Sequence, residues 1–111
     1  MGARMEEERL KSLVEEFLGY LRSTKGYSFH TIEAYRRDLG DFLAFSEGMD
    51  PISPHTLRAY LGYLFKRVKR STILRRLSCL RTFFGFLERR GIVSENPSQE
   101  IGGLKREKYL P

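Results

Sequence analysis

The 111-residue sequence predicts an all-α protein that forms one domain with a single small core. Two observations support this class. Apolar residues recur at helical spacing in four separate segments, and Ser, Pro or Gly residues stand between those segments. No segment shows the alternation of apolar and polar residues that is typical of a β-strand.

The first predicted helix runs from about Glu6 to Ser23, and Gly26 ends it. Glutamates crowd its first turn, where the helix dipole favours negative charge. The expected core residues share one face of this helix: Leu10, Leu13, Val14, Phe17 and Leu21. Residues 1–5 are expected to be a disordered N-terminal segment or residues added for expression.

The second predicted helix begins at an N-cap, Ser28, and ends near Gly48. Its expected core residues are Ile32, Tyr35, Leu39, Phe42 and Leu43. At about 100° per residue, the opposite face carries polar and small side chains. These outward residues are His30, Ala34, Arg37 and Asp41.

The third predicted helix has Ser53 as its N-cap and Pro54 at its first position, and it ends around Arg67. Proline suits that position because its missing N–H would have no partner there in any case. The expected core residues are Leu57, Tyr60, Leu61, Leu64 and Phe65.

The fourth predicted helix opens at Ser71 and closes at Gly91. Its apolar stripe consists of Ile73, Leu77, Leu80, Phe84 and Leu87, and the residues that face away from this stripe are Arg75, Ser78, Thr82 and Arg89. Arg76 and Arg81 flank the stripe, and Cys79 lies beside the polar face as a small filler residue. Beyond Gly91, residues 96–97 predict a turn, residues 97–101 one helical turn, and residue 103 the end of the domain.

Positive charge is concentrated in the middle of the chain. The formal net charge is −1 over residues 1–24, +7 over residues 25–91 and 0 over residues 92–111. No Asp or Glu occurs in the sequence between residues 66 and 81. The basic residues of this stretch are Lys66, Arg67, Lys69, Arg70, Arg75, Arg76 and Arg81. Such a stretch repels itself unless an anion faces it, and a nucleic-acid backbone is the expected partner.

The residues predict no catalytic, metal or cofactor site, so this chain alone is not expected to be an enzyme or to take a small-molecule substrate. His30 and His55 are expected on the surface without a partner at metal-ligand spacing. The single Cys79 has no base beside it in the sequence. No apolar run is long enough for a membrane span, and the charged start does not resemble a secretion signal, so a cytoplasmic protein is expected.

Two helix starts carry the side chains expected to contact double-stranded DNA. The fourth helix could enter the major groove, which is about 12 Å wide. From that helix we expect contacts by Arg70, Ser71, Thr72, Arg75, Ser78 and Thr82. From the second helix we expect contacts by His30, Thr31, Arg36 and Arg37.

Four motifs in register resemble the N-terminal, core-binding domain of tyrosine recombinases. Residues 28–39 (SFHTIEAYRRDL) are similar to the second-helix motif of that domain, and residues 71–87 (STILRRLSCLRTFFGFL) to its fourth helix. Residues 95–97 (ENP) and 104–111 (LKREKYLP) resemble the link to the catalytic domain. The resemblance covers residues 6–111 and is closest to Xer-type recombinases, with phage and integron integrases as near relatives.

This resemblance implies an orthogonal four-helix bundle, SAM-like as in the N-terminal domain of lambda-type integrases, that forms half of a clamp around DNA. By position, the residues that would face DNA are Thr31, Ala34, Arg37, Thr72, Arg75, Arg76 and Cys79. It also implies that other recombinase protomers on the DNA are partners, that residues 104–111 begin a linker, and that catalysis belongs to a second domain absent from this chain. Two alternatives stay open: a helical domain whose basic face binds an acidic protein, and a helix-turn-helix regulator.

Overall fold

The computed structural model describes residues 7–99, which form four α-helices and no strand. The helices are α1 (Glu7–Ser23), α2 (Phe29–Phe45), α3 (Pro54–Phe65) and α4 (Arg70–Arg89). The predicted all-α class is therefore confirmed. The expectations for residues 1–5 and 104–111, and for the domain end at residue 103, fall outside the described residues.

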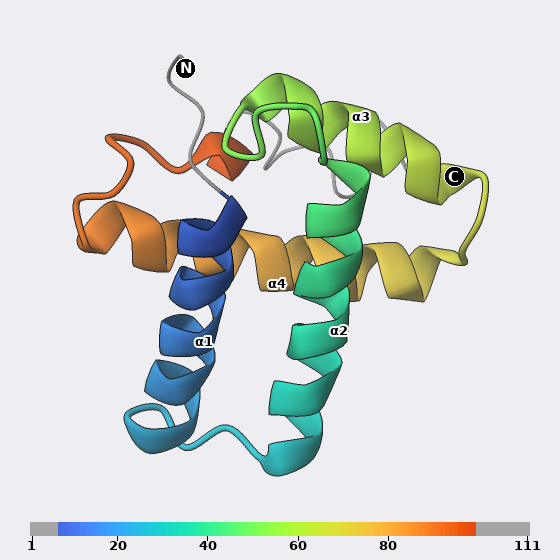
Figure 1. Ribbon diagram of the computed structural model, residues 1–111. Coiled ribbons are helices and arrows are strands. Elements are labelled where there is room, and N and C mark those ends of the chain that lie inside the picture. The colour runs from blue at the N-terminus through green and yellow to red at the C-terminus, as the bar shows by residue number, and fades with distance from the viewer. Residues whose placement is uncertain (1–6, 100–111) are drawn as a thin grey trace.

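Helix α4 is the central element of the bundle. Figure 1 shows α1 and α2 side by side, with α4 lying across both of them and α3 along one end of the pair. Helix α4 packs against all three of the other helices, and α1 packs against α2. Helices that cross in this way form an orthogonal bundle, as the resemblance to the recombinase domain implies.

The predicted helix starts at Ser28 and Ser53 are confirmed. The Ser28 hydroxyl accepts a hydrogen bond from the Thr31 N–H at 3.2 Å, and the Ser53 hydroxyl accepts one from the His55 N–H at 3.0 Å. Each bond satisfies a backbone donor that has no partner inside the helix. Pro54 occupies the first position of α3, as expected.

Three helix ends differ from the prediction by a few residues. Helix α2 ends at Phe45 and α3 at Phe65, because the backbone leaves each helix through a turn before it reaches Gly48 or Arg67. Gly48 has a positive φ of 84°, a conformation that glycine adopts without strain. Helix α4 starts at Arg70 with Lys69 as an extended N-cap, so Ser71 lies inside the first turn.

The predicted core is largely confirmed, although α4 is buried over a wider arc than its single apolar stripe indicated. Phe17 of α1 packs its ring against Phe83 and Phe86, with centroids 5.2 and 5.4 Å apart. The ring centroids of Phe42 in α2 and Phe84 in α4 are 6.1 Å apart. Because helices cover α4 from several sides, residues outside the predicted stripe are also buried. Tyr35, Leu43 and Phe65, expected in the core, are only partly buried.

The segment after α4 returns to the bundle. The Asn96 side chain donates to the Arg81 carbonyl at 3.2 Å and accepts from the Ser98 N–H at 2.9 Å. Residues 97–99 then form a short 3₁₀ turn. The predicted turn at residues 96–97 is confirmed, and the predicted helical turn is confirmed as far as the described residues extend.

Candidate nucleic-acid interface

Five of the seven basic residues between residues 66 and 81 belong to two regions with different neighbours. One is the basic corner, which consists of Lys66, Arg67 and Lys69 in the connection between α3 and α4. The other is the polar network between α2, α3 and α4, which consists of Asp38, Asp41, Tyr60, Arg75 and Arg76.

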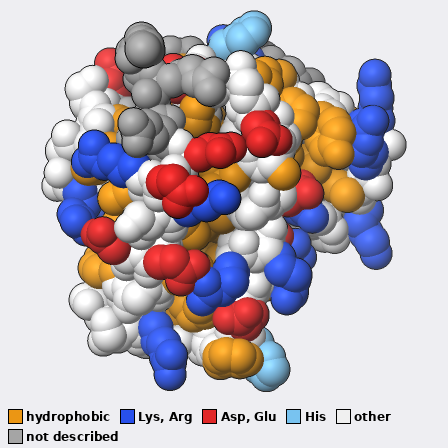
Figure 2. Space-filling view, in the orientation of Figure 1, with side chains coloured by type: hydrophobic (Ala, Val, Ile, Leu, Met, Phe, Trp, Pro, Cys, Tyr) orange, Lys and Arg blue, Asp and Glu red, His pale blue; other side chains and the backbone are white. Residues whose placement is uncertain are grey.

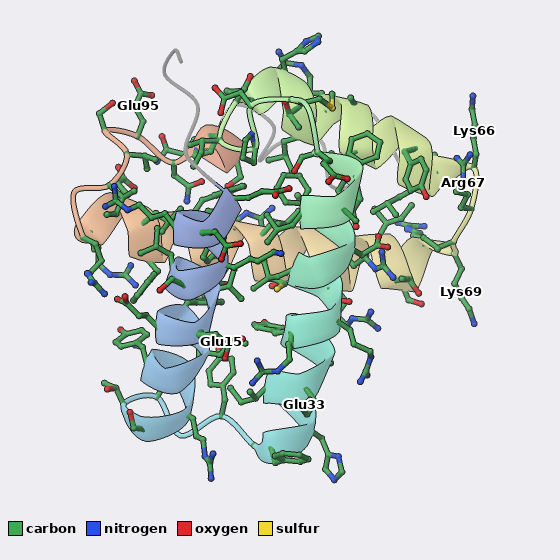
Figure 3. All side chains as sticks on the ribbon, in the orientation of Figure 1. Glu15, Glu33, Lys66, Arg67, Lys69 and Glu95 are labelled. Atoms are coloured by element: carbon green, nitrogen blue, oxygen red, sulfur yellow. The ribbon has the colours of Figure 1, made fainter. Side chains whose placement is uncertain are left out.

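All three side chains of the basic corner are exposed, and those of Lys66 and Lys69 point away from the bundle (Figure 3). Arg67 lies over the Tyr63 ring at 4.0 Å and donates to the Tyr63 carbonyl at 3.1 Å, so its position is partly fixed. Within residues 7–99, Lys66 and Lys69 form no ion pair. Figure 2 shows Lys and Arg side chains projecting at this edge of the molecule. The corner therefore presents uncompensated positive charge to solvent.

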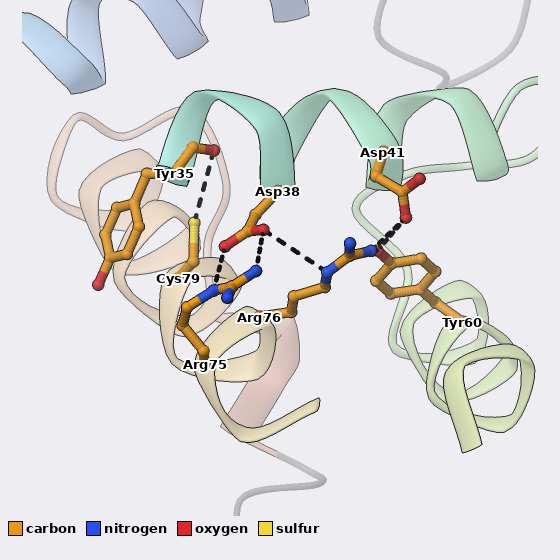
Figure 4. A network of polar contacts seen from close by, with 7 residues as sticks. All are labelled: Tyr35, Asp38, Asp41, Tyr60, Arg75, Arg76 and Cys79. Atoms are coloured by element: carbon orange, nitrogen blue, oxygen red, sulfur yellow. Dashed lines mark hydrogen bonds and ion pairs between the residues drawn. The ribbon is translucent and has the colours of Figure 1, made fainter. Parts of the chain in front are cut away.

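Asp38 is the centre of the polar network and is only 3% exposed. Its carboxylate accepts two hydrogen bonds from Arg75, at 3.1 Å from Nε and 2.8 Å from Nη2. The Nε atom of Arg76 lies 3.5 Å from the same carboxylate (Figure 4). This hydrogen bonding to Asp38 raises the pKa of Arg75, so the guanidinium stays fully charged. A buried carboxylate is stable here because two guanidinium groups compensate its charge.

Arg76 also joins α4 to Asp41 and Tyr60. Its Nη1 atom donates to the Asp41 carboxylate and, at 3.0 Å, to the Tyr60 hydroxyl. The Tyr60 hydroxyl in turn donates to Asp41 at 2.8 Å. Burial, followed by the hydrogen bond to Asp41, raises the pKa of Tyr60. With a side chain only 20% exposed, Arg76 makes its contacts inside the protein, in contrast to its expected place facing DNA.

Cys79 is not exposed, as the expected contact with DNA would require. Its side chain is fully buried where α2 crosses α4, and its Sγ atom lies 4.0 Å from the Tyr35 carbonyl oxygen. Burial, together with the nearby charge of Asp38, raises the pKa of the Cys79 thiol. Cys79 is therefore a neutral core residue, which agrees with its predicted role as a small filler.

The structure separates Arg36 from the other α2 candidates. Arg36 forms ion pairs with Glu15 of α1 and Glu33, and it lines a groove of about 1060 Å³ between α1 and α2. Arg37 is exposed and has no ion-pair partner among residues 7–99. His30 is exposed in the first turn of α2, as expected. Two further candidates on this helix are half-buried: Thr31 and Ala34.

The candidates on α4 differ in how available their polar groups are. Arg75 is half-exposed despite its bonds to Asp38, with 49% of its side chain open to solvent. Arg70 and Ser71 are exposed, whereas Thr72 is half-buried. The Thr82 hydroxyl donates to the Ser78 carbonyl at 2.9 Å, so its donor is already used within the helix.

Sequence reasoning missed the role of Asp38. A signal for it exists, because Asp38 borders the apolar stripe of α2 and Arg76 borders that of α4. Opposite charges at the margins of two apolar stripes indicate where two helices meet. Sequence reasoning also missed Phe29, a large apolar side chain that is 64% exposed beside His30.

A search of residues 7–99 finds no group of three metal-ligating side chains. In the same part of the chain, no helix has the length and apolar character needed to cross a membrane.

Comparison with known proteins identifies relatives over nearly the whole chain. The chain is 37% identical over 106 residues to a tyrosine recombinase XerC of Lactobacillus delbrueckii subsp. bulgaricus. This alignment covers 90% of the chain and 36% of the relative. It is 36% identical over 110 residues to the tyrosine recombinase XerC of Leptospira interrogans, which covers 94% and 35%. The chain thus spans about a third of the length of these curated relatives. No solved structure matches significantly.

The family model for the phage integrase N-terminal SAM-like domain matches residues 14–91, a range that begins in α1 and ends just beyond α4. The match includes the basic corner and the complete polar network. It covers more than half of the sequence and agrees with the four-helix bundle of the structure. The chain therefore belongs to the phage integrase N-terminal SAM-like domain family.

Proposed function

We propose that this chain is the DNA-binding, N-terminal domain of a site-specific tyrosine recombinase of the Xer type. The basic corner carries this proposal, because it holds exposed cations that no acid within residues 7–99 compensates. Uncompensated Lys and Arg on one edge are typical of proteins that bind the phosphate backbone of DNA. The tyrosine recombinases to which the chain is similar support the same conclusion.

In this proposal the corner and α2 position the domain on duplex DNA. Lys66, Lys69 and Arg37 contact phosphates, and α4 approaches the major groove with Arg75 on its outward face. Phosphate contacts fix the register of a protein on DNA, whereas contacts to base edges select the sequence. Strand cleavage and rejoining belong to a separate catalytic domain, and other recombinase protomers on the same DNA are the protein partners. The expected compartment is the cytoplasm, where bacterial DNA lies.

Salt-dependent binding to duplex DNA tests the proposal. We expect the affinity of the 111-residue chain to fall steeply as salt rises, by a slope of about 0.9 in log K per log salt for each phosphate contact. The double variant Arg37→Ala/Lys69→Ala should lower the affinity and reduce that slope by about two. Fluorescence anisotropy with a labelled duplex measures both quantities.

The matched control is Lys11→Ala/Arg22→Ala, which removes the same charge from exposed positions of α1. Its affinity should fall less, and its salt slope should stay close to that of the unmodified chain. Circular dichroism checks that each variant keeps its helices. If the unmodified chain does not bind duplex DNA at low salt, the proposal is wrong, and a basic surface for an acidic protein becomes the better account.

A further inference from the structure

The guanidinium of Arg75 is held along one edge and open along another. Its Nε and Nη2 atoms donate to the two carboxylate oxygens of Asp38 at 3.1 and 2.8 Å. Both hydrogens of Nη1 and the second hydrogen of Nη2 have no acceptor within the described residues. These donors form the end-on fork of the guanidinium, and about half of the side chain is open to solvent.

Asp38 also removes most of the local positive charge around Arg75. The polar network contains two carboxylates, Asp38 and Asp41, and two guanidinium groups, Arg75 and Arg76. Its formal charge is therefore zero. A phosphate gains little from such a neutralised site, because its attraction to protein comes chiefly from uncompensated charge. The basic corner differs in this respect, since its lysines have no ion-pair partner within residues 7–99.

A fixed fork with little net charge suits a neutral ligand that has two adjacent acceptors. In duplex DNA the major-groove edge of guanine, with O6 and N7, is such a ligand for a bidentate arginine. Side-chain entropy that is usually lost when arginine binds has here already been lost to the bonds with Asp38. The geometry points to Asp38 as a positioning residue that orients Arg75 to read one guanine, while the basic corner and Arg37 contact phosphates. This inference rests on the proposed function and assigns separate tasks to its basic residues.

Asp38→Asn and Arg75→Lys test this division of tasks. The asparagine keeps the shape of the side chain and removes its charge, so Arg75 is no longer compensated and loses one of its two hydrogen bonds to residue 38. We expect preference for guanine at one position to fall about tenfold, and the salt slope on duplex DNA to steepen by about one. Arg75→Lys keeps the positive charge but lacks the forked guanidinium. This variant should therefore lose the preference for guanine while its salt slope on duplex DNA stays unchanged.

The probe is a library of short duplexes of random sequence, from which bound molecules are sequenced; a fixed duplex then serves for the salt titration. The matched control is Glu33→Gln, which also removes one carboxylate from α2 but pairs with Arg36 instead of Arg75. This control should retain the guanine preference. Thermal unfolding followed by circular dichroism separates a loss of fold from a change in recognition, and a steeper salt slope cannot arise from mere loss of stability.

The outcomes distinguish this inference from the proposed function. If the unmodified chain binds no duplex at low salt, both are wrong. If it binds DNA but Asp38→Asn keeps the guanine preference and the salt slope, Asp38 is only a structural partner and this inference alone is overturned. If Asp38→Asn does not fold, Arg75→Lys decides, because a retained preference in that variant would show that Arg75 does not read a base.

Discussion

The basic corner and the polar network come from one continuous basic stretch, yet they place their charges in opposite environments. In the corner, Lys66 and Lys69 extend into solvent without an ion-pair partner in residues 7–99. In the network, Arg75 and Arg76 pair with carboxylates of α2, which lie 35 to 38 residues earlier in the chain. The net charge counted along a segment of the sequence therefore differs from the uncompensated charge that the segment exposes at the surface.

Arginine and lysine therefore have two different roles in this domain, one in stability and one in binding an anion. The network holds α2 against α4 through a carboxylate that is 3% exposed. Breaking a buried pair is costly because it leaves a charge without compensation. The corner is surrounded by water, where single charges contribute little to folding but remain available for an anion. Stability and DNA affinity should accordingly respond to different substitutions.

The largest effect on stability is expected from Arg75→Ala/Arg76→Ala. This double variant leaves the buried Asp38 carboxylate unpaired, so the free energy of unfolding should fall by about 3 kcal/mol. Each single variant should cost less than half of that amount, because the remaining arginine still faces Asp38. Urea denaturation followed by circular dichroism measures the three values. Adding Asp38→Asn to the double variant should restore part of the loss, whereas a double variant equal to the sum of the singles would contradict this coupling.

Burial should also make the network region sensitive to alkaline pH. The folded state raises the pKa of Cys79 above its usual value of 9.0, so it binds the thiol proton more tightly than the unfolded state does. The resulting stability is present below pH 9 and is lost as the pH rises further, by about 1.4 kcal/mol for each pH unit. Tyr60 should add a similar loss above its usual pKa of 10.0.

Urea denaturation at several pH values between 7 and 11 measures this dependence. Cys79→Ala serves as the comparison, since it lacks the thiol and should keep its stability up to about pH 10, where Tyr60 and Tyr35, whose pKa values burial also raises, begin to contribute. An identical decline in both proteins just above pH 9 would show that another group is responsible.

A smaller effect is expected from Tyr60→Phe. The ring of Tyr60 stays in the core against Phe42, and only the hydroxyl between Asp41 and Arg76 is lost. Asp41 keeps its contact with Arg76 and is partly open to water, so the cost should be about 1 kcal/mol. Chemical denaturation provides the value. A loss as large as that of the Arg75/Arg76 double variant would mean that the hydroxyl, and not the ion pairs, holds the network together.

The sequence predicted the helices well because their signals are local. The caps at Ser28 and Ser53 depend on a serine followed by a few residues of the same helix, and both are present in the structure. Core residues at helical spacing, such as Phe17 and Leu80, are likewise determined by one helix and its water-facing side.

The candidate interface was harder to predict because it depends on how helices cross. Cys79 is buried by α2, which approaches α4 from outside the predicted stripe. Arg76 is paired with Asp41, and Arg36 with Glu15, through contacts between residues far apart in the sequence. A helical wheel shows which way a side chain points, but not which other helix or charge meets it.

The smallest effect on stability, and the sharpest contrast with the network, is expected from Lys66→Ala/Lys69→Ala. Both side chains are exposed and unpaired within residues 7–99, and Lys69 caps α4 through its backbone without a side-chain hydrogen bond. The free energy of unfolding should therefore change by less than about 0.5 kcal/mol. On duplex DNA the same variant should reduce the salt slope by about two, because two phosphate contacts are lost. Urea denaturation and anisotropy titrations on one preparation compare the two quantities directly. A clear loss of stability with an unchanged salt slope would reverse the roles of the two regions, since the corner would then support the fold and the DNA contacts would have to lie elsewhere.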